Sequence, residues 1–391
     1  MTEFVTATPI DERAALDLLL AVLRVDSVWG RERALAELLA ERMRADGFAD
    51  VTLVEPLPDR PSVVGRIPGT GGGRSLILNG HIDIYELAAD WTRDPFAPAI
   101  EGGRIYGAGV ADEKAGAAAL LSAARLFLDP SHRPKGDVIV MGVSAHFEGG
   151  LGTRAVLGHG IRADAAICCE PSEMRLATAH RGAAYLTITT RGRQAHTSAK
   201  ELGLNAIETM IPIMQGLERL AIPHVPDAVG GPVINIGTIR GGTKHNQVPD
   251  RCEISVDIRV PPSVTPEQAK MEVERMIGAL RRDHPEIDAV VEFSPYWLSG
   301  PRYPAMTPPG EPIVAAVQMA RTAAGLPRAE PVTLPVWADM CVLDRAGIPT
   351  VNIGPGGPPY NWADESVAVA EYLAAVRTYA ATIAAFCNQR P

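Results

Sequence analysis

The sequence lacks any long apolar run, and none approaches the roughly 18 uninterrupted apolar residues of a membrane-spanning helix. Its N-terminus, MTEFVTATPIDERAALDLLLAVLRV, also lacks the positive flank and small-residue cleavage site of a secretory signal. Mean hydropathy is +0.04, a value that requires no lipid environment. We therefore expect a cytoplasmic protein that does not associate with membranes.

Positive charge is scarce as well. Lys and Arg number 37 against 46 Asp and Glu, which gives a net charge of -9 at pH 7. A protein of this charge offers no basic surface to a phosphate backbone or to an anionic membrane. Nucleic acid is therefore not expected as a partner.

Cysteines are few and odd in number. There are five, at positions 168, 169, 252, 341 and 387, and their spacing is not that of a structural zinc site. This pattern is typical of reduced thiols in a cytosol. Cys168 and Cys169 lie in the apolar stretch DAAICCE, where we expect small core side chains of a buried strand.

What the sequence does contain is enough apolar residues for two cores. At 391 residues the chain exceeds the length at which a single hydrophobic core stops growing, so two domains are expected. Hydrophobic residues make up 46% and charged residues 21%, as in ordinary globular proteins.

Buried strands and helices alternate in the first part of the chain. SLILNG, DVIVMGVSA and DAAICCE are continuous apolar runs, and the helix-forming stretch AGAAALLSAARLFLDP lies between the first two. Strand, helix and strand in this order predict a right-handed crossover. The expected fold class is therefore α/β, with a mainly parallel mixed sheet flanked by helices, over residues 1–180 and 296–391.

From residue 181 to 295 the pattern changes. AAYLTITTRG, VINIGTIRGG, RCEISVDIRV and AVVEFSP alternate apolar and polar residues, as half-exposed antiparallel strands do. Helical stretches lie between them, near 204–221 and 265–283. We expect residues 181–295 to form an inserted α+β domain with one solvated sheet face.

A histidine and several acids gather where the predicted buried strands end. His81 and Asp83 follow the first of these strands, Glu148 the second and Glu170 the third. Asp112 opens the Ala/Leu helix, where an N-cap is its structural alternative. His81 with the three acids Asp112, Glu148 and Glu170 at one sheet edge suits zinc, manganese or cobalt better than a thiolate-bound metal.

Longer segments resemble one enzyme family. NGHIDIYELAADWTRDPFAPAIEGGRIYGAGVADEKAG, EPS, GRQAHTSAKELGLNAIE, GGTKHNQVPDRCEISVDIR and AGIPTVNIGPGG follow one another along nearly the whole chain. Together they resemble the co-catalytic zinc metallopeptidase and deacylase family that includes acetylornithine deacetylase, succinyl-diaminopimelate desuccinylase and glutamate carboxypeptidase. The resemblance implies that His81 and Glu170 bind one metal ion, that Asp112 bridges two ions, and that Asp83 orients His81.

The resemblance also implies how a substrate is bound. His196 is similar to a histidine of the inserted domain that reaches a neighbouring subunit's active site and stabilises the oxyanion. Asn246 and Arg259 are similar to residues that hold the substrate, and a guanidinium suits a carboxylate. Gly354 and Gly356 belong to a glycine-rich loop that approaches the substrate. The inserted domain of this family commonly forms a dimer interface, so a homodimer is expected.

The chain departs from the family where two adjacent glutamates are normally found, the first a general base and the second a metal ligand. Here the segment reads SAHFEGGLG. In one register Glu148 is the ligand and Phe147 takes the base position; in the other His146 takes the base position and Phe147 the ligand position. Either His146 or Glu148 is then the candidate base, since both lie on one face of an extended strand. Phe147 either packs in the core or forms an apolar wall for an aromatic or hydrophobic substrate.

A second departure concerns the family's last metal-ligating histidine. The nearest residue here is Asn361 in YNWADES, an amide that binds zinc poorly and that we assign to substrate binding. Both departures concern ligands of the same ion, the second of the two that the family binds. We therefore expect one firmly bound divalent metal, zinc in the first place and manganese or cobalt otherwise, with a second ion weak or absent.

These observations predict a metal-dependent hydrolase of an amide or other C–N bond in a small carboxylate-bearing substrate. A single metal lowers the pKa of bound water to about 7, so hydrolysis is compatible with the departures. Two alternatives remain open. One is an aminohydrolase, lyase or cyclising enzyme of specialised metabolism on the same fold, and the other is a non-catalytic ligand-binding homologue.

Overall fold

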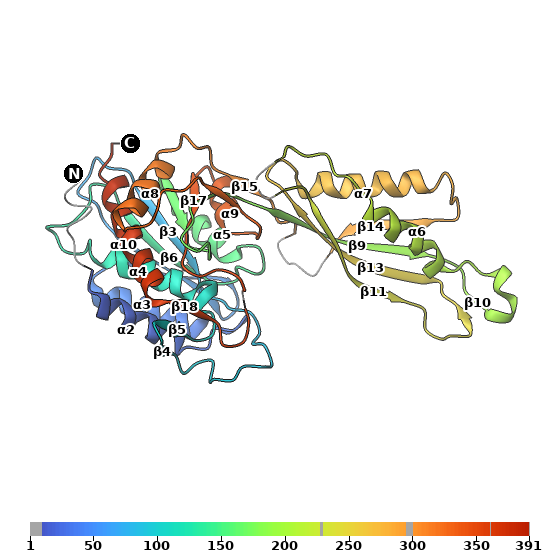
Figure 1. Cartoon of the computed structure of the whole chain (residues 1–391), viewed down its shortest axis with the longest axis horizontal. Coiled ribbons are helices and arrows are strands. Elements are labelled where there is room, and N and C mark those ends of the chain that lie inside the picture. The colour runs from blue at the N-terminus through green and yellow to red at the C-terminus, as the bar shows by residue number, and fades with distance from the viewer. Residues whose placement is uncertain (1–9, 227–229, 295–299, 360, 391) are drawn as a thin grey trace. The chain divides into compact units, whose positions relative to one another are not determined.

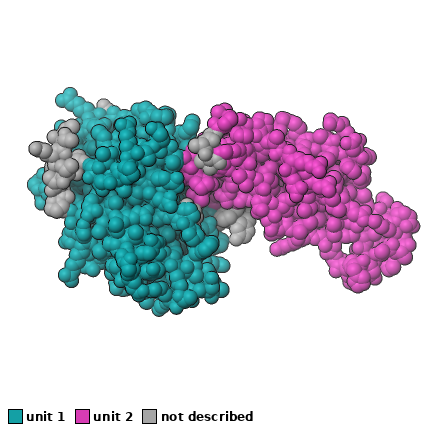
Figure 2. Space-filling model, viewed as in Figure 1, with its two compact units in different colours: residues 1–179, 306–332, 338–391 teal, residues 180–305, 333–337 magenta. Residues whose placement is uncertain are grey.

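The computed structural model describes residues 10–226, 230–294, 300–359 and 361–390. The chain divides into two units, shown in different colours in Figure 2. Unit 1 comprises residues 1–179, 306–332 and 338–391, and unit 2 comprises residues 180–305 and 333–337. Unit 2 therefore includes a second short segment, 333–337, that no change of pattern in the sequence indicated.

Unit 1 is built on a nine-stranded mixed sheet (Figure 1). The strand order is β1 (Ala49–Leu57), β2 (Arg60–Ile67), β6 (Val138–Val143), β3 (Leu76–His81), β7 (Ala165–Cys168), β17 (Thr350–Asn352), β8 (Ala177–His180) and β15 (Ala305–Met306), with β16 (Val332–Leu334) beside β8. The central strands β6, β3, β7 and β17 run parallel, whereas β1, β2 and β8 pair antiparallel. The predicted α/β class is confirmed.

Helices cover both faces of this sheet. One layer contains α2 (Glu12–Leu23), α3 (Arg33–Asp46), α4 (Ala115–Arg125), α8 (Pro312–Ala323) and α10 (Val369–Phe386), and its core includes Leu76 and Leu78 of β3. Because side chains alternate along a strand, Asn79 points the other way and donates to Thr153 of α5 (Leu151–Gly158) at 2.9 Å. The short helix α9 (Met340–Arg345) contacts β7 and β17.

A small three-stranded sheet lies within unit 1. It consists of β18 (Ser366–Ala368), β5 (Arg104–Tyr106) and β4 (Ala99–Glu101) in that order. The turn η1 (Val110–Lys114) follows β5 and leads into α4. This sheet therefore brings the chain before α10 next to the loop that carries Asp112.

Unit 2 contains a four-stranded antiparallel sheet, in the order β11 (Val233–Gly241), β13 (Arg251–Val260), β9 (Gly182–Arg191) and β14 (Asp288–Phe293). Burial alternates along β13, whose buried side chains form a core with α6 (Ala206–Glu218) and α7 (Pro266–Leu280). A capping box of Thr265 and Gln268 begins α7. A short hairpin of β10 (Ala195–His196) and β12 (Gln247–Val248), with the 3-10 turn η2 (Thr197–Leu202), completes the unit.

The described residues contain no helix of sufficient length and apolar character to cross a membrane. All five cysteines are buried free thiols.

Candidate metal centre

His81 is the last residue of β3 and is buried. Its Nδ1 lies 2.9 Å from the backbone oxygen of Asp83, to which it donates, so Nε2 is directed at Oδ1 of Asp112 at 3.2 Å. A histidine held in this way at one nitrogen presents the other nitrogen as a ligand atom. The carboxylate of Asp83 also lies beside this ring, with Oδ1 3.8 Å from Nδ1 of His81, and its Oδ2 accepts from the backbone N–H groups of His146 at 2.9 Å and Phe147 at 3.3 Å.

His146 lies directly against His81, with ring centroids 4.2 Å apart and ring planes 16° from parallel. Its Nδ1 is 3.1 Å from Oδ1 of Asp339, and its Nε2 is 3.5 Å from Oε1 of Glu170. Asp339, which precedes α9, also accepts from the hydroxyl of Thr153 at 2.6 Å. A carboxylate therefore orients His146 so that Nε2 faces the ends of the central strands.

Three of these side chains can share one ion. His81, His146 and Glu170 each offer a ligand atom, and these atoms all lie within 4.8 Å of one another. Two imidazole nitrogens with a carboxylate oxygen form the mixed donor set that zinc and similar divalent metals accept. Among the described residues, the buried Oε2 of Glu113 also has no hydrogen-bond partner. The residues present thus fit a divalent metal.

The electrostatics of the cluster also favour a bound cation. Burial opposes the charged form of His81, but the carboxylates of Glu113 and Asp112 outweigh it and raise the pKa of His81 well above its usual value. Burial and the charge of His81 lower the pKa of His146. Burial raises the pKa of Glu113 to about 8, and burial with the charge of Glu113 raises that of Glu170 well above its usual value. Acids held this close repel one another, and a divalent ion between them relieves that repulsion.

Phe147 packs against the cluster. It is 7% exposed, and its ring lies edge-on to His81 at 5.5 Å and tilted over Tyr85 at 3.9 Å. The side chain therefore contributes an apolar wall between the metal centre and the loop that follows β3.

Glu148 lies apart from the cluster. Its carboxylate accepts from Nε1 of Trp29 and pairs with Arg60, which also binds Glu32 through Nε at 2.9 Å. The chain turns after β6, where Ala145 has a φ of 54° and the N–H of Gly149 bonds to the oxygen of His146 at 2.8 Å. The extended strand assumed from the sequence does not continue, so His146 and Glu148 do not share a face, and this geometry gives Glu148 no place as ligand or base.

The structure brings the remaining unit 1 candidates close to the cluster. Nδ2 of Asn361 donates to Oδ2 of Asp112 at 3.4 Å. Gly354 lies directly against the strand end before Glu170, because a Cβ at Gly354 would stand 1.9 Å from the backbone oxygen of Cys169. Gly356, with a φ of 86°, donates its N–H to Glu371 at 3.0 Å.

Within unit 2 the three expected substrate residues are not all together. His196 pairs with Gln247 across the β10–β12 hairpin, and the backbone oxygen of Asn246 accepts from Thr197 at 3.1 Å. Arg259 lies at the opposite end of β13, where it pairs with Asp257 at 3.0 Å. The His196 and Asn246 segments therefore form one site, and Arg259 belongs to another part of the sheet.

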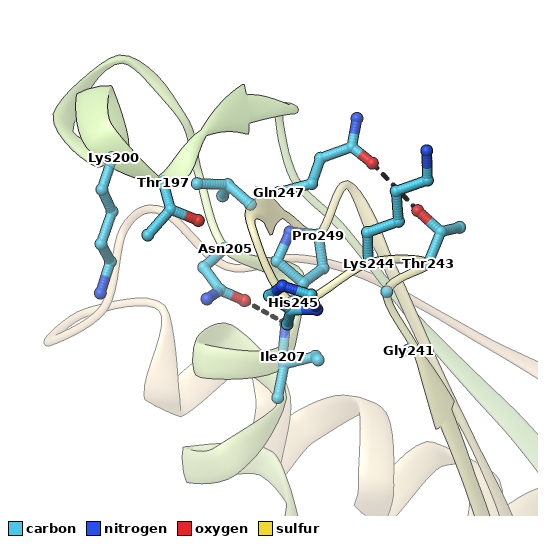
Figure 3. A pocket seen from close by; sticks show the side chains of 12 residues that line it. Thr197, Lys200, Asn205, Ile207, Gly241, Thr243, Lys244, His245, Gln247 and Pro249 are labelled. Atoms are coloured by element: carbon cyan, nitrogen blue, oxygen red, sulfur yellow. Dashed lines mark hydrogen bonds between the residues drawn. The ribbon is translucent and has the colours of Figure 1, made fainter.

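A recess of about 570 Å³ opens beside the His196 and Asn246 segments. Figure 3 shows Thr197 and Lys200 on one side of it and Thr243 and Lys244 on the other. The recess is lined by polar and basic side chains, by Ile207, Val248 and Pro249, and by the backbone that flanks both predicted residues.

Two family models match parts of the chain. The "Peptidase family M28" model matches residues 62–167, which include His81, Asp112 and His146, and the "Peptidase dimerisation domain" model matches residues 178–285 in unit 2. The second match lies almost entirely within the inserted unit 2. Curated deacylases match most of the chain. N-formyl-4-amino-5-aminomethyl-2-methylpyrimidine deformylase of Bacillus subtilis is 29% identical over 76% of this chain and 76% of its own. Succinyl-diaminopimelate desuccinylase 2 of Ruegeria sp. is 29% identical over 78% of this chain and 79% of its own.

These matches support membership of a metallopeptidase and deacylase family. A solved structure of a tripeptidase from Staphylococcus aureus has the same fold, with a TM-score of 0.80, 21% identity, and coverage of 97% of this chain and 100% of that one. Sequence reasoning missed Asp339 and Arg60, which lie outside the family-like segments, and Glu113, which lies inside one directly after Asp112.

Proposed function

We propose that this protein is a metal-dependent amide hydrolase that removes an acyl group from a small N-acylated amine. The observation that carries the proposal is the convergence of His81, His146 and Glu170 ligand atoms within 4.8 Å of one another. The similarity to a deformylase and a desuccinylase supports the reaction type.

In this proposal the chain holds one divalent ion, for which zinc suits the donor set best. His81 and His146 supply nitrogen ligands, Glu170 supplies oxygen, and Asp112 lies beside His81 as a further oxygen donor. When bound, such an ion lowers the pKa of water and polarises an amide carbonyl. Asp339 keeps Nε2 of His146 directed into the site.

Unit 2 carries the other candidate substrate residues. We propose that His196 donates to the developing oxyanion and that Asn246, in the same segment pair, contacts the substrate, whereas Arg259, at the other end of β13, offers a guanidinium to a carboxylate separately. We propose a homodimer through unit 2, whose edge strand β11 is exposed along most of its length. Light scattering should then give twice the chain mass of 41.6 kDa.

The test combines metal analysis with turnover. The protein, purified without chelator, is assayed for released amine on N-formyl, N-acetyl and N-succinyl amines, in parallel with elemental analysis. We expect His81→Ala and His146→Gln to lose bound metal and at least about a hundredfold in kcat/KM, because each removes a ligand. His159→Gln, on the exposed end of α5, is the matched control and should retain both.

Two results would contradict the proposal. One is unchanged turnover in His146→Gln with metal retained. The other is an acid product without label when the reaction runs in ¹⁸O-water, since hydrolysis places one water oxygen in that product, whereas elimination or cyclisation does not.

A further inference from the structure

Asp339 is available to His146 because it does not cap the helix that it precedes. An aspartate at the start of a helix normally accepts from backbone N–H groups of the first turn. Within the described chain, the side chain of Asp339 makes no such bond to α9. Its Oδ1 lies 3.1 Å from Nδ1 of His146, and its Oδ2 accepts from the hydroxyl of Thr153 at 2.6 Å. The carboxylate therefore has a role outside its own helix.

Thr153 connects this carboxylate to the strand that carries His81. A threonine inside a helix often bonds back to the carbonyl group four residues earlier, but the hydroxyl of Thr153 bonds to residues outside α5. It donates to Asp339 and accepts from Nδ2 of Asn79 at 2.9 Å. Asn79 lies two residues before His81 on the same face of β3. Asn79, Thr153, Asp339 and His146 thus form a chain of hydrogen bonds that joins the two histidine segments.

The chemistry of the four groups fixes the direction of every bond in this chain. An amide nitrogen only donates, so the oxygen of Thr153 accepts from Asn79 and its one proton is donated to Asp339. The carboxylate accepts at both oxygens and therefore takes the Nδ1 proton of His146. The lone pair of His146 is then on Nε2, the atom that lies 3.5 Å from Oε1 of Glu170. The chain selects the tautomer of His146 that can bind a metal.

Burial and backbone shape protect this arrangement. All four side chains are buried, and buried polar groups depend on one another for their hydrogen bonds. The backbone before α5 also leaves space for the carboxylate. Gly150 has a φ of 68°, and a Cβ at this position would lie 2.5 Å from Oδ1 of Asp339. A side chain at position 150 would therefore displace Asp339 from His146.

We infer that Thr153 and Asn79 are positioning residues of the metal centre, which act through Asp339 to fix the tautomer and the ring orientation of His146. The inference rests on the proposed hydrolase function and extends it to two residues that supply no ligand atom to the proposed ion. Removal of such outer partners of a metal-binding histidine typically lowers metal affinity about ten- to a hundredfold.

The test removes one hydroxyl group. Thr153→Val keeps the branched shape of the side chain but cannot donate to Asp339, whereas Thr153→Ser keeps the donor. The Kd for Zn²⁺ is measured on the apoprotein by competition with a chromophoric chelator. Long-range ¹H–¹⁵N NMR spectra of the labelled protein report the tautomer of His146, whose signals are assigned by comparison with His146→Gln.

We expect Thr153→Val to raise the Kd for Zn²⁺ about ten- to a hundredfold and to give a mixture of His146 tautomers. Thr153→Ser should restore most of the affinity and the Nδ1–H form. Asn79→Ala, which leaves Thr153 in place, should raise the Kd about threefold or more, the scale of one hydrogen bond. Thr322→Val, at an exposed threonine of α8 that bonds only within its own helix, is the matched control and should behave as the wild type.

The outcomes separate the positioning chain from the reaction. An unchanged Kd and an unchanged tautomer in Thr153→Val overturn the inference, even where the melting temperature of the apoprotein falls, and the hydrolase then stands on His146→Gln. An equal loss of affinity in Thr153→Val and Thr153→Ser also overturns it, because the hydroxyl would not be the cause. Loss in Thr153→Val with rescue in Thr153→Ser, in a protein that releases no amine from N-acyl amines, supports the positioning chain and contradicts the hydrolase.

Discussion

Arg60 pairs with Glu148 away from the candidate metal centre. The guanidinium is buried between Glu32 and Glu148, and Trp29 donates to the same Glu148 carboxylate. Removing one member of a buried ion network leaves the charge of its partner uncompensated. The role of these residues is therefore to stabilise the fold. His146, two positions earlier, has its nitrogens at Asp339 and Glu170 instead. Neighbouring residues in one segment thus have separate tasks.

The first prediction separates these tasks. Glu148→Gln should keep its metal, because the carboxylate lies with Arg60 and not with His81. It should lower the free energy of unfolding by about 1–3 kcal/mol, the cost of a weakened buried hydrogen-bonded pair. Elemental analysis and urea unfolding measure the two effects. Loss of the metal from a folded Glu148→Gln protein, with metal retained in His146→Gln, would reverse the assignment.

At the scale of elements, the site depends on where strands end. β3, β6 and β7 end at one edge of the sheet, which brings His81, the His146 segment and Glu170 together. The turn η1 is not part of the sheet. It is held from outside, by the carboxylate of Glu365 next to β18.

The burial of the Glu365 carboxyl predicts that the stability of the fold depends on pH. Burial raises the pKa of Glu365 from 4.5 to about 7 in the folded protein. The protonated carboxyl therefore contributes fully to the free energy of unfolding below about pH 4.5. This contribution is lost as the pH rises towards 7. Glu365→Gln, which stays neutral, should lack this loss, so between pH 5 and pH 8 the wild type should lose up to about 3 kcal/mol relative to the variant.

Urea unfolding at the two pH values, with chelator in every sample, measures this difference. Glu330→Gln on the surface is the matched control and should track the wild type. A Glu365→Gln protein whose stability falls in parallel with the wild type would show that ionisation of this group does not oppose folding.

At the scale of the whole molecule, each unit has its own core. The unit 1 core is formed by its helices with the large sheet, and the unit 2 core by α6 and α7 with the antiparallel sheet. The metal centre belongs to unit 1 alone. A metal ion that binds the folded form of one unit raises the free energy of unfolding of that unit.

Chelation should therefore act on unit 1. An ion present at about a hundred times its Kd contributes about 2.7 kcal/mol, so its removal should lower the unfolding temperature of unit 1 by roughly 5–10 °C. Calorimetry with and without chelator gives the shift, and hydrogen exchange locates it. Faster exchange confined to β9 and β13 of unit 2 would contradict this placement.

Periodicity and apolar runs were enough to predict most elements. The runs at SLILNG, DVIVMGVSA and DAAICCE correspond to β3, β6 and β7, and the alternating segments correspond to β9, β11, β13 and β14. The hairpin of β1 and β2 was not predicted, because its residues combine the continuous apolar pattern of a buried strand with the alternating pattern of a half-exposed strand. The segment 333–337 joins unit 2 through contacts that no local pattern encodes.

The sequence by itself determined the α/β class, the family resemblance and the candidate residues His81 and Glu170 at strand ends, because local patterns specify strands and parallel strands end at one edge. It also marked Asp112 at the start of a helix. Only the tertiary structure separated Glu148 from the cluster and placed Asp339 beside His146. The reason is that these choices depend on a turn after β6 and on partners nearly two hundred residues away, such as Asp339 for His146. Side-chain direction in a turn follows from packing and hydrogen bonds formed across the fold, which a one-dimensional pattern does not contain.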